Sequence, residues 1–202
     1  MINRVNISAS VHPNFMGCWV FEDTSVCDDL IQFFEENRES HRAGRTSLRS
    51  VDETVKQSTD IPIAPLDLKE EKFRVFSKFI EHLHCCHLDY FEQWELLKKF
   101  YPRLHIGPFN LRRYDTGGHF GAVHSERTSL NALHRVFAWM TYLNDVPEGG
   151  ETEFTLFDLS IKPEKGKTLI WPAEWTHAHR GSIVKQGPKY ITTGWLQLPD
   201  DL

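Results

Sequence analysis

Apolar residues recur at a helical period in the first half of the chain and alternate with polar residues in the second half. A short β-prone run at 16–21 is followed by apolar residues at helical spacing through about residue 38, and 23–25 supply polar side chains that can cap a helix. A second helical stretch extends from about Leu68 towards Leu97 and ends before Pro102, because proline cannot continue a helix. The first half therefore predicts two amphipathic helices, each with one buried stripe.

After Pro102 the alternation is typical of β-strands. The expected strands are 109–114, 119–124, 136–143, 151–156, 159–161, 168–171 and 190–198. Turn sequences separate several of them, among them Asp115-Thr116-Gly117-Gly118 and 145–150. Short strands with turn signals between them indicate a sandwich or jelly roll. The sequence predicts helices first, followed by a β-fold that carries the chemistry.

The segment 41–65 follows neither period and is rich in polar residues. An irregular segment of this length inside a compact domain is often functional or disordered. We expect a mobile lid that closes on the substrate, with Lys56, Ser58 and Asp60 as substrate contacts. A disordered surface loop is the alternative, since the same composition serves both.

Composition is ordinary for a soluble globular protein: of 202 residues, 40% are hydrophobic and 25% charged. We expect a single domain over 1–202, with helical support and the candidate lid in 1–102 and the β-core in 103–202. Lys and Arg number 23 against 28 Asp and Glu, a net charge of -5, so there is no clear nucleic-acid footprint.

The cysteine pattern indicates a reducing compartment. Cys18, Cys27, Cys85 and Cys86 form no C-x-x-C pair, which suggests neither a disulfide framework nor a zinc knuckle. No window of the chain is apolar over the length needed to span a bilayer. We therefore expect a cytoplasmic protein without membrane association.

Histidines are concentrated at 82–87, within the second predicted helix. His84 and His87 are three residues apart and could share one helix face. No acidic or cysteine partner at ligand spacing completes a tetrahedral set. We interpret these as structural histidines beside buried cysteines.

A more informative metal pattern lies at His124-Ser125-Glu126, followed much later by His177 and His179. On an extended strand His124 and Glu126 point to the same side and can chelate together. Two imidazoles and one carboxylate are the ligands of non-haem Fe(II) when coordination positions must stay open. Because His177 and His179 are also two apart, both remain candidates for the second imidazole.

Several motifs accompany this pattern in a fixed order. They are Leu111–Tyr114, His124-Ser125-Glu126, the run Tyr142–Phe154, Ile161–Gly166, His179, Gly187-Pro188-Lys189 and Trp195. Together they resemble the catalytic domain of prolyl 4-hydroxylase-like 2-oxoglutarate and Fe(II)-dependent oxygenases, over residues 107–198. The resemblance implies an α+β, mainly β fold: a double-stranded β-helix (jelly roll) with supporting N-terminal helices.

The resemblance also assigns the metal and catalytic residues as His124, Glu126 and His179. In the family the distal histidine precedes a basic anchor by about ten positions, which fits His179 and Lys189 rather than His177. Glu126 departs from the family, which more often has Asp at this place. The longer side chain still presents an oxygen ligand.

Four residues are expected around the cosubstrate on the same basis. Lys189 would bind the far carboxylate of 2-oxoglutarate, Tyr142 would donate its hydroxyl to that carboxylate, Tyr114 would lie near the iron, and Trp195 would form a packing wall. Tyr142 has an alternative reading as a core aromatic residue. Arg180 is a reserve cation, but it follows His179 directly and should point to the opposite face.

The implied activity is that of an Fe(II)- and 2-oxoglutarate-dependent dioxygenase that consumes O2, forms succinate and carbon dioxide, and hydroxylates an unactivated C–H bond. A prolyl residue in a peptide or protein is the first candidate target; a free amino acid or another small-molecule substrate stays open. One alternative is a non-catalytic double-stranded β-helix module that binds a small acid or a peptide. A structural metal site is less favoured, because such sites prefer four ligands.

Overall fold

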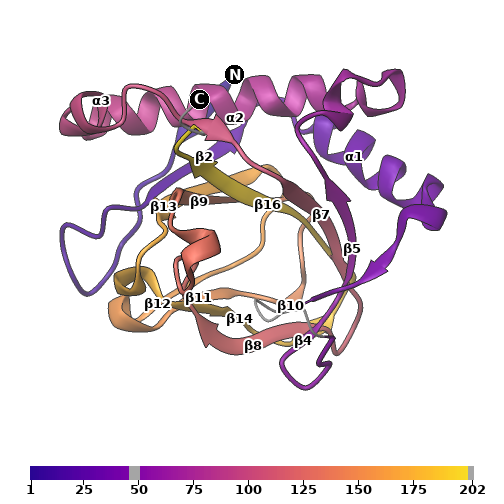
Figure 1. Ribbon diagram of the computed structural model, residues 1–202. Helices are drawn as coiled ribbons and strands as arrows, with labels where there is room; N and C mark the ends of the chain where they lie inside the picture. Colours follow the sequence, from indigo (N-terminus) through magenta and orange to yellow (C-terminus); the bar gives the residue numbers. More distant parts are fainter. Residues whose placement is uncertain (46–50, 200–202) are drawn as a thin grey trace.

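A computed structural model describes residues 1–45 and 51–199. Three helices lie along one side of the molecule and the strands form the rest (Figure 1). The helices are α1 (Ser25–Glu36), α2 (Phe76–Gln93) and α3 (Leu96–Phe100). They cover the outer face of the larger of two antiparallel sheets, so this sheet is buried on both faces.

The larger sheet has the strand order β1-β2-β13-β9-β16-β7-β5-β3, and β6 pairs with β16. Its strands are β1 (Ile2–Arg4), β2 (Gly17–Phe21), β3 (Arg42–Ala43), β5 (Thr59–Ile63), β6 (His105–Ile106), β7 (Phe109–Tyr114), β9 (Arg135–Tyr142), β13 (Lys167–Pro172) and β16 (Lys189–Gln197). Apart from the pairs β1–β2 and β3–β5, neighbouring strands of this sheet are far apart in sequence. This arrangement brings the chain's last long strand between β9 and β7 at the centre of the sheet.

The smaller sheet has the order β12-β11-β14-β8-β4 and faces the larger one across the interior (Figure 1). Its strands are β4 (Lys56–Gln57), β8 (His119–His124), β11 (Thr152–Phe154), β12 (Leu159–Ile161) and β14 (His179–Gly181), and a separate pair is formed by β10 (Glu148–Gly149) and β15 (Val184–Gln186). The two facing sheets form the expected double-stranded β-helix.

Each face of the larger sheet contributes to a different core. On β16, Tyr190 and Leu196 pack with the helices, whereas Ile191 and Trp195 belong to the cluster between the sheets. Side chains alternate between the faces of a strand, so one strand serves both cores. On α2, the fully buried Phe79 packs against Trp139 with ring centroids 5.7 Å apart. Burial of one such ring contributes about 1.5–3 kcal/mol.

The predicted helices are confirmed, but the second differs at both ends: it stops at Gln93, and the separate helix α3 follows before Pro102. At the start of α1 the Asp23 carboxylate accepts a hydrogen bond from the Ser25 backbone N–H at 2.9 Å. The second helix begins at Phe76 rather than near Leu68, because 67–73 form two short 3-10 turns. The expected strands of the second half appear with small shifts of their ends.

The expectation that 41–65 is irregular throughout is wrong. The strands β3, β4 and β5 lie in this segment, and β4 joins the smaller sheet through β8 while β5 joins the larger one through β7. Ile61 and Ile63 are buried against the helices, but Asp60, directly before Ile61, is buried on the other face. The strand is only five residues long and contains Pro62, which weakens the strand signal, and Asp60 has the pattern of a solvent-facing position. The part of the expected lid at 46–50 lies outside the described residues.

No helix within 1–45 and 51–199 combines the length and apolar character needed to cross a bilayer.

Candidate active site

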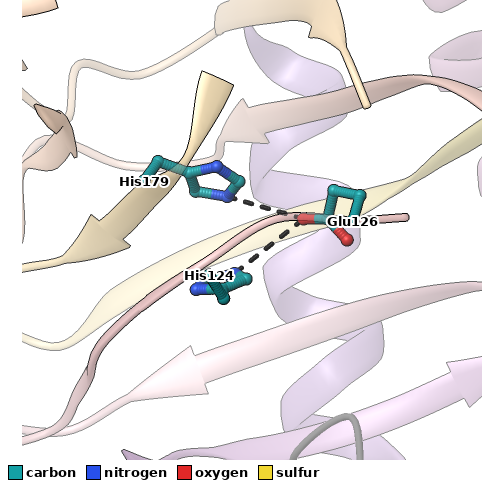
Figure 2. Close-up of side chains that lie close together, drawn as sticks. All are labelled: His124, Glu126 and His179. Atoms are coloured by element: carbon teal, nitrogen blue, oxygen red, sulfur yellow. Dashed lines mark ion pairs between the residues drawn. The ribbon is translucent and has the colours of Figure 1, made fainter. Parts of the chain in front are cut away.

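Three of the predicted site residues converge where the smaller sheet opens towards the interior (Figure 2). His124 is the last residue of β8, Glu126 follows two positions later, and His179 begins β14, where it pairs directly with His124. Glu126 Oε1 lies 3.5 Å from His179 Nε2 and 3.9 Å from His124 Nε2. One ligand atom from each residue lies within 4.8 Å of the others.

Backbone carbonyl groups orient the two imidazoles. His124 Nδ1 lies 3.0 Å from the Ala122 oxygen, and His179 Nδ1 lies 2.9 Å from the His177 oxygen. Since a carbonyl oxygen only accepts, each Nδ1 donates a proton to it, and each Nε2 is the ring nitrogen that faces Glu126. Burial, together with the nearby His179, lowers the pKa of His124 to about 4. His124 is therefore a neutral imidazole at physiological pH.

The Glu126 carboxylate is held by residues from the larger sheet. Trp195 Nε1 donates to Glu126 Oε2 at 2.8 Å. Arg135 donates to the Glu126 backbone oxygen at 3.1 Å and lies 3.6 Å above the Trp195 ring. Burial by itself would raise the pKa of Glu126, but its contact with His179 and the neighbouring His124 hold it at about 2. The carboxylate is ionised and fixed in orientation.

These donors fit Fe(II). Two imidazole Nε2 atoms and one carboxylate oxygen face a common point, and this donor set is typical of open non-haem iron sites. The rings are further held by neighbours: Phe120 stacks on His124 with centroids 3.9 Å apart, and Trp171 lies edge-on to His179 at 5.1 Å. The arrangement can hold a cation with one side left free for other ligands.

His177, the alternative second histidine, points elsewhere. Its Nε2 donates to the Asn14 backbone oxygen at 2.8 Å, and its ring lies 5.0 Å from that of Phe157. The remaining nitrogen is 3.0 Å from the Thr176 hydroxyl. Both ring nitrogens are engaged away from Glu126, and the geometry favours His179.

Lys189 lies deeper in the interior as the first residue of β16, with only 4% of its surface exposed. Its Nζ donates to the Gly150 backbone oxygen at 2.6 Å and lies 5.2 and 5.5 Å from the rings of Tyr114 and Tyr142. No carboxylate within the described ranges lies within 4.0 Å of it. Burial, reinforced by Arg112, lowers its pKa to about 7. A buried ammonium without a carboxylate partner is suited to receive an anionic ligand.

The two tyrosines differ in what their hydroxyls do. Tyr142 is fully buried and donates its hydroxyl to Thr152 Oγ1 at 2.6 Å. This hydrogen bond favours the core-aromatic reading of Tyr142. Tyr114 accepts a hydrogen bond from Arg112 at 3.5 Å, so its own hydroxyl hydrogen is left for another acceptor.

The remaining expectations concern Trp195 and Arg180. Trp195 is more than a packing wall, because its indole holds the candidate metal-ligating carboxylate. Arg180 is half-exposed and pairs with Glu153 at 2.6 Å, on the opposite face from His179 as expected.

Two features of the interior were missed in the sequence. Arg135 begins an otherwise apolar strand and gave no signal of its contact with Glu126. Arg112 lay within a recognised motif but had no assigned role, and it forms a buried ion cluster with Asp60 and Lys56. The expectation that Lys56 and Asp60 belong to a mobile lid does not fit the structure, which buries them on β4 and β5 with 2% and 6% of their surfaces exposed.

A double-stranded β-helix with two histidines and a carboxylate at its open side, and a buried lysine further in, defines the class of 2-oxoglutarate- and Fe(II)-dependent oxygenases. The family model described as the 2OG-Fe(II) oxygenase superfamily matches residues 109–197. Over these residues the chain is similar to that superfamily, whose cofactors are Fe(II) and 2-oxoglutarate, with O2 as co-reactant.

Known relatives agree with this assignment. The chain is 27% identical over 139 residues to probable prolyl 4-hydroxylase 9 of Arabidopsis thaliana, covering 56% of the chain and 48% of that protein. It is 28% identical over 74 residues to human prolyl 4-hydroxylase subunit alpha-1, covering 33% of the chain and 14% of that protein. The resemblance to prolyl 4-hydroxylase-like oxygenases is confirmed, while the chain spans about half the length or less of these curated relatives.

Solved structures show the same fold. A Pseudomonas putida prolyl-4-hydroxylase superimposes with a TM-score of 0.71 at 13% identity, covering 92% of this chain and 94% of that one. A viral collagen prolyl hydroxylase from Paramecium Bursaria Chlorella virus-1, in complex with 2OG, gives 0.63 at 17% identity, covering 98% and 96%. A Trichoplax adhaerens prolyl hydroxylase bound to a hypoxia inducible factor peptide fragment gives 0.70 at 13% identity, covering 92% and 84%.

Proposed function

We propose that this protein is an Fe(II)- and 2-oxoglutarate-dependent dioxygenase that hydroxylates a prolyl residue in a peptide or protein. One observation carries the proposal: His124, Glu126 and His179 converge in the same interior as the buried Lys189, which has no carboxylate partner among the residues that the structure describes. The prolyl target is supported by the prolyl 4-hydroxylase relatives, and the peptide nature of the substrate by the peptide bound to the Trichoplax enzyme.

In this proposal His124, Glu126 and His179 hold Fe(II) on one face and leave its other positions open. When bound, the metal supplies the oxidising chemistry that couples conversion of 2-oxoglutarate to succinate and carbon dioxide with hydroxylation. Lys189 pairs with the cosubstrate's far carboxylate, which restores the charge that burial disfavours. Tyr114 has a hydroxyl hydrogen left to donate in the same region.

The protein's own contribution is orientation and exclusion of water. Trp195 and Arg135 fix the Glu126 carboxylate, while the backbone oxygens of Ala122 and His177 fix the imidazole tautomers. Phe120 and Trp171 line the histidines with apolar surface. Such preorganisation keeps the ligands in place without reorganisation during the reaction.

The non-catalytic alternative is not favoured, because a module that only binds an acid has no need of three preoriented metal ligands beside the anion site. We also propose a cytoplasmic location. Its support is the cysteine pattern: all four cysteines are free, and three of them are buried.

The metal assignment is tested by anaerobic titration with Fe(II) and 2-oxoglutarate. We expect a weak visible charge-transfer band that is lost in His124→Ala and in His179→Ala, and that persists in the matched control His177→Gln. Admission of O2 with prolyl peptides should then release succinate from the parent protein. A band lost in His177→Gln but kept in His179→Ala would show the ligand assignment to be wrong, and a band without succinate release would favour the binding module.

A further inference from the structure

Lys56, Asp60 and Arg112 form a buried ion cluster on one wall of the interior. Arg112 grips the Asp60 carboxylate with two bonds, Nε to Oδ1 at 2.7 Å and Nη2 to Oδ2 at 2.9 Å. Lys56 Nζ donates to Oδ2 at 3.0 Å. The three side chains come from β7, β4 and β5, so the cluster joins the two sheets.

Strand alternation directs this cluster to the interior rather than to the helices. On β7, Phe109 and Leu111 belong to the core under the helices, whereas Arg112 lies on the other face beside the Tyr114 hydroxyl. Lys56 lies 5.6 Å from the Phe120 ring, and that ring stacks directly on His124. The cluster is therefore separated from a candidate metal ligand by a single aromatic side chain.

Hydrogen-bond donors outnumber acceptors in the cluster. Asp60 is saturated, since its two oxygens accept bonds from Ser58, Lys56 and twice from Arg112. Beyond these bonds, Lys56 donates to the Arg45 oxygen and Arg112 to the Tyr114 hydroxyl. An ammonium has three N–H groups and a guanidinium five. Counted over residues 1–45 and 51–199, one N–H of Lys56 and two of Arg112 are left for a further acceptor.

Positive charges also outnumber negative charges in this part of the interior. Lys56, Arg112 and Lys189 are buried cations of the interior, and Arg135 is a half-buried one. The carboxylates that act on them are the buried Asp60 and the half-buried Glu126 and Glu151, so the cations outnumber the carboxylates by one. Fe(II) and the 2-oxoglutarate dianion cancel each other, so the loaded interior keeps a positive charge. Burial, and the neighbouring Arg112, lower the pKa of Lys56 to about 8. A second anion would relieve this unfavourable state.

We propose that Lys56 and Arg112 form a carboxylate-binding subsite, so that the substrate carries a carboxylate near the carbon that is hydroxylated. The inference rests on the proposed function, for which it names a substrate class. Two sources share this chemistry: an acidic side chain beside the target proline in a peptide, or the carboxylate of a free amino acid. Asp60 serves to hold both cations in place, because its own acceptors are filled.

Binding of matched probes tests the subsite. Anaerobic calorimetry with the Fe(II)- and 2-oxoglutarate-loaded protein would compare acetyl-Glu-Pro-Gly-amide and acetyl-Gly-Pro-Glu-amide with their Gln counterparts, and L-proline with L-prolinamide. We expect the acidic member of at least one pair to bind about tenfold tighter, the scale of one charge-assisted hydrogen bond. A preference confined to the peptides or to proline identifies the source. Equal binding in every pair, or none at all, overturns the proposal.

Variants at Lys56 separate the subsite from the fold. Lys56→Met removes one cation but leaves the bidentate Arg112–Asp60 pair, and it should abolish most of the acidic preference. Lys56→Arg should retain it, and Lys185→Met, an exposed lysine paired with Glu148, should leave it unchanged. Lys56→Gln serves the same purpose if the Met variant does not fold. A preference that survives loss of the Lys56 charge contradicts the assignment.

The charge-transfer band keeps the two proposals distinguishable. Absence of the band in the parent protein would count against the proposed function itself. A normal band with no preference for acidic probes would remove only the subsite. If Lys56→Met weakened the band titration with 2-oxoglutarate as much as Lys189→Met, the cluster would belong to the cosubstrate and the subsite proposal would fail.

Discussion

The two faces of the larger sheet differ in the kind of side chain that they bury. The outer face packs with α1 and α2 through apolar side chains such as Phe34, Phe76 and Phe79, all fully buried. The inner face combines apolar residues with the buried charges of Arg112 and Lys189. Burial of apolar side chains on the outer face stabilises the fold without desolvating any charge. The inner face accepts desolvated charge, which is unfavourable for folding unless ligands compensate it.

The largest expected effect therefore lies on the outer face. Phe79→Ala removes a ring in contact with Trp139 and Phe21 and should lower the free energy of unfolding by about 3–5 kcal/mol. Chemical denaturation measures this loss. Phe100→Ala, at a ring that is 62% exposed, is the matched control and should change stability by less than about 0.5 kcal/mol. Similar losses in both variants would contradict the division between the faces.

The buried residues of the outer face were easier to predict from the sequence than those of the inner face, for a physical reason. Apolar residues at helical spacing, such as Val26, Leu30 and Phe33, need no partner to be recognised. Asp60 on β5 has the pattern of a solvent-facing polar position. Its burial depends on Arg112, which lies 52 positions later and becomes its partner only in the fold. Strand alternation could not have revealed this pair.

The same limit applies to the site. Motif spacing selected His124, Glu126 and His179, which the structure brings together. It could not show that Trp195 donates to Glu126, since that bond joins residues 69 positions apart, one on β16 and the other in the loop after β8. The role of a residue within a local motif can be predicted from the sequence, whereas a role that depends on a tertiary contact cannot.

On the inner face, the loss of Lys189 should have the next largest effect. Lys189→Met should weaken 2-oxoglutarate binding by about 2 kcal/mol or more, the value of a charge-assisted contact, with Fe(II) binding nearly unchanged. Titration of the charge-transfer band measures both. Lys185→Met removes an exposed lysine and provides the control. Unchanged affinity in Lys189→Met would place the anchor elsewhere.

The pH dependence of 2-oxoglutarate binding provides a second test of Lys189 as the anchor. The folded-state pKa of Lys189 is about 7, below the ordinary lysine value of 10.5. Between these values the unfolded chain binds more protons than the folded one, so the Lys189 contribution to the free energy of unfolding rises with pH. Binding of 2-oxoglutarate requires the charged form, and the affinity should fall by up to about tenfold per pH unit above pH 7. Lys189→Arg should flatten this dependence; an unchanged slope would exclude Lys189 as its source.

A smaller effect is expected at Trp195, which supports the Glu126 carboxylate. Trp195→Phe keeps a ring under Arg135 but removes the indole N–H that donates to Oε2. Fe(II) affinity should fall by about tenfold, as for other groups that orient a metal ligand. Trp175→Phe changes a tryptophan that is 70% exposed and serves as the control. Equal Fe(II) affinity in the parent and Trp195→Phe would limit Trp195 to packing.

The smallest expected effect is at Arg180, the reserve cation. His179 and Arg180 are consecutive on β14, so their side chains point to opposite faces, and Arg180 pairs with Glu153 near the surface. Arg180→Ala should lower the free energy of unfolding by about 0.5 kcal/mol, since solvent screens such pairs, and should leave 2-oxoglutarate affinity unchanged. Denaturation and titration of the charge-transfer band measure the two quantities in one preparation. A loss of cosubstrate affinity comparable to that in Lys189→Met would mean that Arg180 reaches the interior, and the contrast between the two faces of β14 would then fail.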